Sequence, residues 1–313
     1  MKLKYRILAS LVATSMAYSQ TTSEIVGYTT QTLETGYNLV GLNLHNSVLV
    51  KGTFESELVD DEADFDSVLT DTDAVYILEI LSGDQEGATA EFSSADAIDS
   101  TINLSGELGA GAAEYQIRKA KKLSEVVSLD NIQTGTTAIR ADRVLVFNAG
   151  SYDSYYYSSS KLTWLLTTDI FGSNPVDPYL SYSDAVIILR LSDSTADEEL
   201  VSSGTVKTES TVITAFEGFT PISVSSPAGQ TLNNSGLQEF LTSGRNSLQS
   251  DIVYIPSNSG YDQYYYNSNN SVWTSASSIF TNDAGDTELP NAVYILRRSS
   301  NSIAGLFSSP LDL

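Results

Sequence analysis

The sequence contains no cysteine and only one histidine, His45, among its 313 residues. Without cysteine the chain can form no disulfide, no thiolate zinc site and no thiol nucleophile, and one histidine excludes zinc sites built from several imidazoles. A serine–histidine–aspartate triad would have to use His45, but the nucleophile-elbow pattern GxSxG is missing, as are phosphate-binding loops and dinucleotide fingerprints. We therefore predict that His45, in the segment LNLHNS, is a surface or strand-end histidine.

Basic residues are scarce, because 16 Lys and Arg stand against 39 Asp and Glu and leave a formal net charge of −23. A chain this acidic repels nucleic acid and anionic lipid surfaces, so we predict no nucleic-acid partner. Long apolar runs are missing as well. A membrane-spanning helix needs about 20 apolar residues, and we predict no transmembrane segment after residue 19.

Residues 1–19 have the pattern of a secretory signal peptide. Lys2, Lys4 and Arg6 precede a short apolar run, and Ala17 and Ser19 occupy the −3 and −1 positions of a cleavage site. Cleavage there removes three basic residues and makes the formal charge still more negative. We expect a secreted or cell-surface protein that relies on core burial rather than disulfides.

Short runs rich in Val, Ile and Tyr lie between clusters of Ser, Thr, Asn, Asp and Gly, and they include VYILEI, RVLVFN, AVIILRL, DIVYI and AVYILRR. This composition favours strands. Helical periodicity is limited to residues 113–127 and 236–243, each a candidate short helix between strands. We predict an all-β fold of two or three sandwich- or barrel-like units with short antiparallel strands.

Two parts of the chain are nearly the same. Residues 142–164 read DRVLVFNAGSYDSYYYSSSKLTW, and residues 251–273 read DIVYIPSNSGYDQYYYNSNNSVW. A second set of similar segments reads DAVYILEI at 73–80, DAVIILRL at 184–191 and NAVYILRR at 291–298, and TGYNLVGLNL at 35–44 resembles EGFTPISVSS at 217–226. Such self-similarity predicts repeated structural units. We divide the chain into residues 1–19, 20–110, 111–203 and 204–313.

The order of these segments carries a family resemblance. The segments that carry the resemblance are, in order, GYNLVGLNL, VYILEILSGDQEG, AAEYQIRKAKKLSEV and two YYY…W blocks. With them the chain resembles an uncharacterised family of secreted, repeat-containing β-rich proteins found mainly in Verrucomicrobia and related bacteria. The resemblance covers nearly the whole chain after residue 19. It implies export, a β-rich repeat architecture and an extracellular location, but no activity and no functional residues.

The duplicated aromatic blocks are the candidate binding elements. Alternation along a strand places Tyr156 on the face of Tyr152, and Tyr155 and Tyr157 on the face of Asp153. The aromatics then either pack across strands in a core, or form a platform for sugar rings or a contact between subunits. The candidate residues are Tyr152, Tyr155, Tyr157, Trp164, Tyr261, Tyr264, Tyr266 and Trp273.

The acidic run at residues 59–67 is the candidate calcium segment, with Asp60, Asp61, Asp64 and Asp66 as its oxygen ligands. It lacks the glycine and the final glutamate of an EF-hand loop, so we predict a solvated acidic loop and no cofactor. The basic stretch IRKAKK at 117–122 has two interpretations. It forms a solvated helix face, or it contacts an acidic patch on the next copy and builds a head-to-tail assembly.

We predict an exported, non-enzymatic structural or adhesive protein of the cell surface or extracellular matrix, able to self-assemble. An alternative is a carbohydrate-binding protein that uses the Tyr/Trp blocks, so the expected partner is the protein itself or a surface polysaccharide. A second alternative is a carboxylate-dependent polysaccharide hydrolase or lyase, which composition leaves open because it needs only two converging carboxylates.

Overall fold

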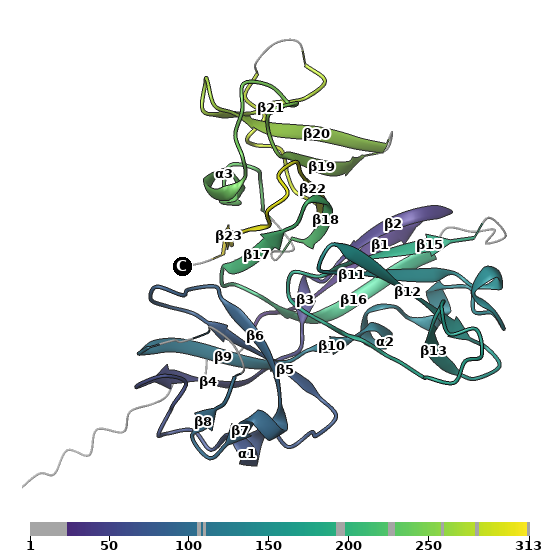
Figure 1. Ribbon diagram of the computed structural model, residues 1–313, viewed down its shortest axis with the longest axis vertical. Coiled ribbons are helices and arrows are strands. Elements are labelled where there is room, and N and C mark those ends of the chain that lie inside the picture. The colour runs from purple at the N-terminus through teal and green to yellow at the C-terminus, as the bar shows by residue number, and fades with distance from the viewer. Residues whose placement is uncertain are drawn as a thin grey trace, which may run out of the picture.

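A computed structural model describes residues 24–104, 108, 111–191, 198–224, 229–257, 260–278 and 282–311. The predicted all-β class is confirmed, and the strands pair antiparallel in several sheets. Figure 1 shows three bodies, with an N-terminal sheet at lower left, a middle sheet at right and a C-terminal sheet at the top. The α-helices of the described residues are one turn long: α1 (Phe65–Val68), α2 (Leu123–Val126) and α3 (Leu237–Phe240).

The N-terminal sheet has four strands. In spatial order they are β4 (Val48–Phe54), β9 (Ala113–Lys119), β5 (Val75–Ile80) and β6 (Thr89–Ser93). The small ribbon of β7 (Ala97–Ile98) and β8 (Thr101–Ile102) lies beside α1. Their apolar faces enclose a core around the stacked rings of Phe54 and Tyr115, 3.9 Å apart.

The middle and C-terminal sheets have the same strand arrangement. The middle sheet runs β13 (Thr163–Leu166), β12 (Ser151–Ser158), β11 (Arg143–Asn148), β15 (Ala185–Arg190), β2 (Gly36–Gly41). The C-terminal sheet runs β21 (Val272–Ser275), β20 (Gly260–Asn267), β19 (Ile252–Ser257), β22 (Ala292–Arg297), β18 (Gly218–Ser223). The similar sequence segments thus occupy corresponding strands.

Two ribbons also correspond. In the first ribbon, β1 (Val26–Leu33) pairs with β16 (Glu198–Val206), and the end of β16 also pairs with β3 (Leu44–His45). In the second ribbon, β17 (Thr211–Ala215) pairs with β23 (Ile303–Phe307). A last small ribbon joins β10 (Lys121–Lys122) to β14 (Tyr179–Leu180). In each body the ribbon contributes apolar residues to the core under the sheet, such as Leu200 and Phe307.

The sheets cross the boundaries that we placed in the sequence. β2 lies within 20–110 but pairs with β15, and β9 lies within 111–203 but pairs with β4 and β5. The N-terminal sheet is therefore inserted in the chain between the first and the remaining strands of the middle sheet.

The prediction of a helix over residues 113–127 is wrong for its first half. Ala113, Tyr115 and Ile117 alternate with polar residues at the period of a strand, and they point into the N-terminal core. The intervening Gln116 and Arg118 are also buried, because polar partners satisfy them on the other face. Only residues 123–126 form a helical turn, whereas α3 lies within the predicted segment 236–243.

The middle and C-terminal sheets pack against each other through the faces opposite their cores, where Leu39 and Ile187 meet Ala292. The contact is close enough to require glycine at position 41. A Cβ there would lie 1.9 Å from the carbonyl oxygen of Asn291. Asn43 adds a hydrogen bond of 2.9 Å from its Nδ2 to Asn291 Oδ1.

Candidate functional site

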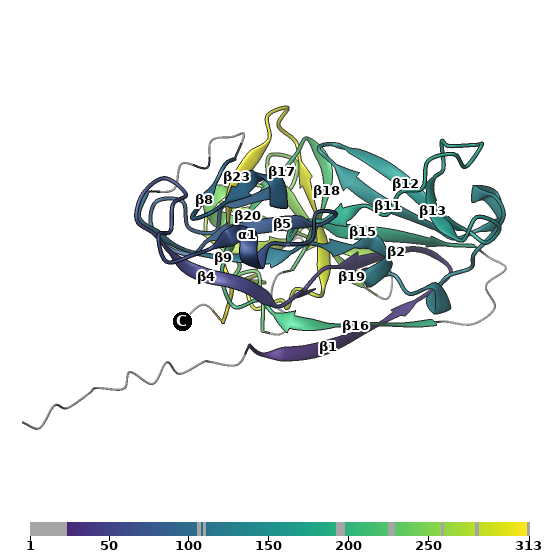
Figure 2. The same ribbon diagram turned by 90° about the horizontal axis from the view of Figure 1, so that it is seen from below.

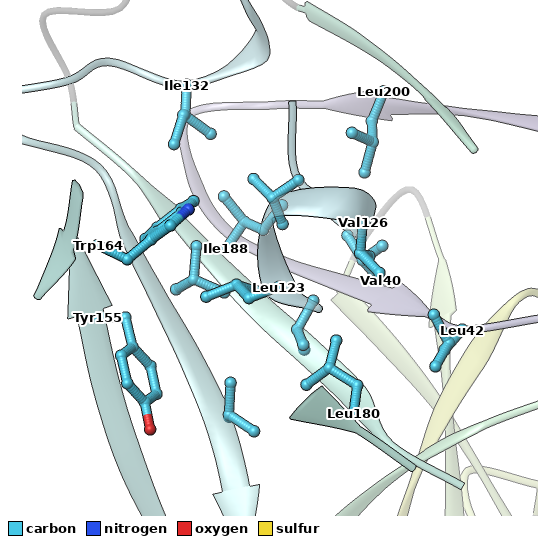
Figure 3. Close-up of a cluster of buried hydrophobic side chains, with 14 of the residues drawn as sticks. Val40, Leu42, Leu123, Val126, Ile132, Tyr155, Trp164, Leu180, Ile188 and Leu200 are labelled. Carbon is cyan, nitrogen blue, oxygen red and sulfur yellow. The ribbon is translucent and has the colours of Figure 1, made fainter. Parts of the chain in front are cut away.

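Six of the eight candidate aromatics belong to the two hydrophobic cores. Trp164 is 3% exposed and Trp273 is 1% exposed. Figure 3 shows Trp164 and Tyr155 among the Leu, Ile and Val side chains of the middle core. Tyr157 meets Trp164 edge to face at 5.7 Å between ring centroids, and Tyr266 meets Trp273 in the same way at 5.6 Å. Tyr264 packs against the C-terminal core as well. These six rings therefore pack within or against the two cores.

Strand alternation places the other two candidates, Tyr152 and Tyr261, on the opposite faces of β12 and β20. Tyr152 pairs with Phe147, whereas Tyr155 pairs with the core residue Val144. Tyr152 is 38% exposed and Tyr261 is 40% exposed. The faces opposite the two cores, through which the sheets pack together, therefore each carry one partly exposed repeated tyrosine.

These tyrosines belong to an aromatic patch, which lies where β11 and β12 approach β18 in Figure 1. Around Phe147, the rings of Tyr152 and Phe216 lie at 5.2 and 5.7 Å. On the C-terminal sheet each neighbouring pair of rings makes an edge contact at 5.1 to 6.4 Å. The patch comprises Phe147, Tyr152, Phe216, Phe219, Tyr254, Tyr261 and Tyr294.

Tyrosines from the middle and C-terminal sheets interact electrostatically within the patch. Burial, and then the neighbouring hydroxyl groups of Tyr261 and Tyr152, raise the pKa of Tyr294. Tyr152 comes from the middle sheet and the other two tyrosines come from the C-terminal sheet, so the patch spans both bodies. The internal repeat in the sequence identified Tyr152 and Tyr261 as candidates. It did not indicate that Phe147, Phe216 and Phe219 lie beside them.

A junction cleft of about 490 Å³ opens beside the patch. All three bodies line it, with Glu91 from β6, Asp153 from β12 and Thr220 from β18. Phe147 and Phe216 belong to both the cleft and the patch. The two features therefore form one continuous surface that combines aromatic rings with hydroxyl and carboxylate groups.

Two carboxyl groups of the cleft, Asp184 and Glu91, have raised pKa values. Burial raises the pKa of Asp184 to about 7, and the nearby Glu91 adds to this rise. Burial also raises the pKa of Glu91, against the effect of a hydrogen bond from Ser181. The backbone amide of Ser181 donates to Asp184 Oδ2 at 2.6 Å, so this carboxyl group also closes the turn before β15. Sequence reasoning did not select either residue as a site.

The calcium candidates are not brought together. Asp60 is buried and accepts a hydrogen bond of 2.7 Å from the Tyr115 hydroxyl, whereas Asp61, Asp64 and Asp66 are exposed. Over the described residues no group of three or more His, Cys, Asp or Glu side chains is arranged to hold a metal ion. The prediction of a solvated loop is wrong for Asp60, because its carboxylate is a buried acceptor for a core tyrosine.

His45 lies at a strand end, as predicted, but it is buried rather than on the surface. Its ring meets Tyr182 edge to face at 4.7 Å. Burial, followed by the positive charges of Lys207, Arg118 and Lys121, holds the pKa of His45 well below its ordinary value. The imidazole is therefore neutral and enclosed, and it is not available as a solvent-exposed base.

The basic stretch 117–122 belongs to strands β9 and β10 rather than to a helix face. Arg118 is buried and pairs with Glu24 at 3.1 Å, and the buried Lys121 donates to the Ser203 carbonyl at 2.8 Å. Lys119 pairs with Asp71 at 2.6 Å at the surface. These partners lie within the same chain, so the stretch does not offer a free basic surface to another copy.

No family model matches the chain, and no curated protein and no solved structure matches it either. The described helices include none with the length and apolar character needed to cross a membrane.

Proposed function

We propose that the protein is exported, is not an enzyme, and acts as an adhesive at the cell surface or in the extracellular matrix by binding polysaccharide. The aromatic patch is the observation that carries this proposal. It joins rings from two sheets on one partly exposed surface, beside a cleft rich in hydroxyl and carboxyl groups. The signal-peptide pattern and the resemblance to secreted repeat proteins support export.

The patch suits sugar rings physically. Phe219 and Tyr261 are 48% and 40% exposed and offer apolar ring faces for the C–H faces of sugars. Their edge contacts hold them in place, so binding costs little side-chain entropy. The carboxyl groups of Glu91 and Asp153 in the adjoining cleft can accept hydrogen bonds from sugar hydroxyls.

The formal charge of −23 restricts the class of ligand. Anionic polysaccharides are repelled, whereas neutral and cationic ones are not. We therefore expect retention by neutral or amino-sugar polymers and weak retention by polyuronates or sulfated glycans at low salt.

Affinity electrophoresis in gels that contain single polysaccharides, preceded by a glycan array, tests the proposal. Phe219→Ala and Tyr261→Ala should each lower retention by about tenfold, the usual loss at an aromatic hot spot. Phe171→Ala is the matched control, because Phe171 is 82% exposed and lies outside the patch. Unchanged retention of both patch variants, with their folds intact, would contradict the proposal.

The two carboxyl groups of the cleft favour a second candidate, a carboxylate-dependent hydrolase or lyase. Asp184, with its raised pKa, is half protonated near neutral pH and could serve as an acid toward a glycosidic oxygen. Release of reducing ends from the retained polysaccharide, lost in Glu91→Gln and Asp184→Asn, would establish this function. Retention without any cleavage would leave binding as the activity.

A further inference from the structure

β1 is an edge strand whose outer side carries no partner strand among the described residues. The sheet order is β1, β16, β3, so β16 covers only one side of β1. Figure 2 shows β1 along the lower margin of the molecule, with β16 between it and the rest of the fold. β1 is eight residues long, which makes it one of the longer strands.

The phase of the hydrogen bonds shows which backbone groups face outward. The amide of Val206 donates to the carbonyl of Ile25 at 2.8 Å, so odd-numbered residues of β1 face β16. The outward N–H and C=O groups therefore belong to even-numbered residues. These are Val26, Tyr28, Thr30 and Thr32.

Three other edge strands of the described structure are protected against pairing. β4 carries Lys51 and a register shift, and β18 carries Pro221. β17, the counterpart of β1, is closed because the amide of Val212 donates to the carbonyl of Gly87 at 2.8 Å. The sequence of β1, VGYTTQTL, has no proline and no charge, which are the usual protections of an edge.

The exposed face of this ribbon carries three large apolar side chains beside the polar Thr30, Thr32, Ser203 and Glu199. Val26 and Tyr28 are 71% and 76% exposed, and Val201 of β16, opposite Thr30, is 57% exposed. Alternation places these three side chains on one face. An edge strand without proline or charge, beside exposed apolar side chains, is characteristic of a strand that pairs with another chain.

We propose that β1 pairs antiparallel with β1 of a second copy, about a two-fold axis that passes through Thr29. The two three-stranded sheets then form one continuous six-stranded sheet. An antiparallel strand is complementary to its own copy under two-fold symmetry. The charge distribution favours this occupant, because β1 itself is uncharged and Glu24, which this register places opposite Glu34 of the second copy, is already paired with Arg118 of its own chain. This pairing is independent of polysaccharide binding.

The absence of cysteine allows a direct test of the register by cross-linking. In the proposed pairing, Thr29→Cys faces its own copy in a non-hydrogen-bonded pair, where Cα atoms lie about 4.5 Å apart, within disulfide range. Mild oxidation of the secreted protein should give a covalent dimer. Asn270→Cys, in an exposed turn of the C-terminal sheet, is the control and should not cross-link above background. A Thr29→Cys protein that stays monomeric under oxidation overturns the proposal.

Sedimentation analysis of the unmodified protein provides the second test. Thr30→Pro removes one outward amide and leaves the bonds to β16 intact, so it should abolish the dimer, as should Thr30→Lys. Added salt should strengthen the dimer, because it screens the repulsion between acidic copies. A monomeric wild type, a dimer that survives both substitutions, or a dimer that weakens with salt overturns the proposal.

Discussion

At the scale of single residues, the face of a strand decides what an aromatic side chain does. Tyr155 and Tyr152 lie on the same strand, three positions apart. One packs under Val144 in the core, and the other is exposed beside Phe147. In the sequence both tyrosines belong to the same repeated block. Tyr155 is a core residue and Tyr152 is a candidate ligand contact only because alternate residues of a strand point to opposite faces.

The buried pair of Glu79 and Lys207 joins the N-terminal sheet to the segment that leads into β17. Its atoms are 2.5 Å apart and neither side chain is exposed. Gln116 and Thr211 complete the hydrogen bonds of Glu79. An uncompensated buried charge is much more costly than a missing surface pair.

Lys207→Met should therefore lower the free energy of unfolding by about 3–5 kcal/mol, because it leaves Glu79 unpaired. Lys119→Met, which breaks the exposed pair with Asp71, should have a much smaller effect, because solvent screens that pair. Urea titration followed by circular dichroism measures both values. Equal losses would show that the buried pair contributes no more than a surface pair.

The raised pKa of Asp184 makes the free energy of unfolding decrease as the pH rises. The pKa is about 7 in the folded protein and 3.8 ordinarily, so the folded state binds this proton more tightly. The stabilisation is complete below pH 3.8 and is lost as the pH rises through 7. Asn291 occupies the aligned position in the other sheet, and an asparagine at position 184 keeps an oxygen that can accept from the Ser181 amide.

Asp184→Asn should accordingly raise stability by about 2 kcal/mol at pH 8 and have almost no effect at pH 4. Thermal unfolding at pH values between 3.5 and 8.5 measures the difference. Asp153→Asn, in the same cleft, is the control. A constant difference across this range would refute the shifted pKa.

At the scale of elements, close packing between sheets depends on single positions. Gly41 lies at the end of β2 against Asn291, in the contact that places the middle and C-terminal sheets and so assembles the aromatic patch. Its backbone could accommodate alanine if the neighbouring sheet were absent. The need for glycine comes only from the other sheet.

Gly41→Ala should destabilise the protein by about 1–3 kcal/mol, the usual cost of an overpacked contact, and should also weaken polysaccharide retention. Gly27→Ala is the matched control in another strand, since a Cβ there would meet Val206 at an ordinary 3.5 Å. Differential scanning calorimetry and affinity electrophoresis compare the two. A neutral Gly41→Ala would mean that the sheets can separate without loss.

At the scale of the whole molecule, the chain builds its sheets from distant segments. The N-terminal sheet has β9 as an inner strand, and the middle sheet receives β2 from the beginning of the chain. The C-terminal sheet and its ribbon draw all their strands from residues 211–307. These differences predict which parts fold alone.

A fragment of residues 208–313 should fold with a protected, blue-shifted Trp273, whereas a fragment of residues 20–110 should remain unfolded because β9 is missing. Extending the second fragment to residue 122 restores β9 and should increase strand content. Far-ultraviolet circular dichroism and amide exchange distinguish these results. A folded 20–110 fragment would show that β9 is dispensable.

The sequence by itself determined the all-β class, the correspondence of the YYY…W blocks and the face of each tyrosine, because strand periodicity and composition are local properties. It misassigned residues 113–119, because Ala, Glu, Gln, Arg and Lys favour helices, whereas burial of Tyr115 and Ile117 in the N-terminal core selects a strand. Only the tertiary structure brought Phe147, Phe216 and Phe219 together with Tyr152 and Tyr261, and Glu91 near Asp184. Their proximity depends on the packing of separate sheets, for which contacts between distant residues leave no local pattern.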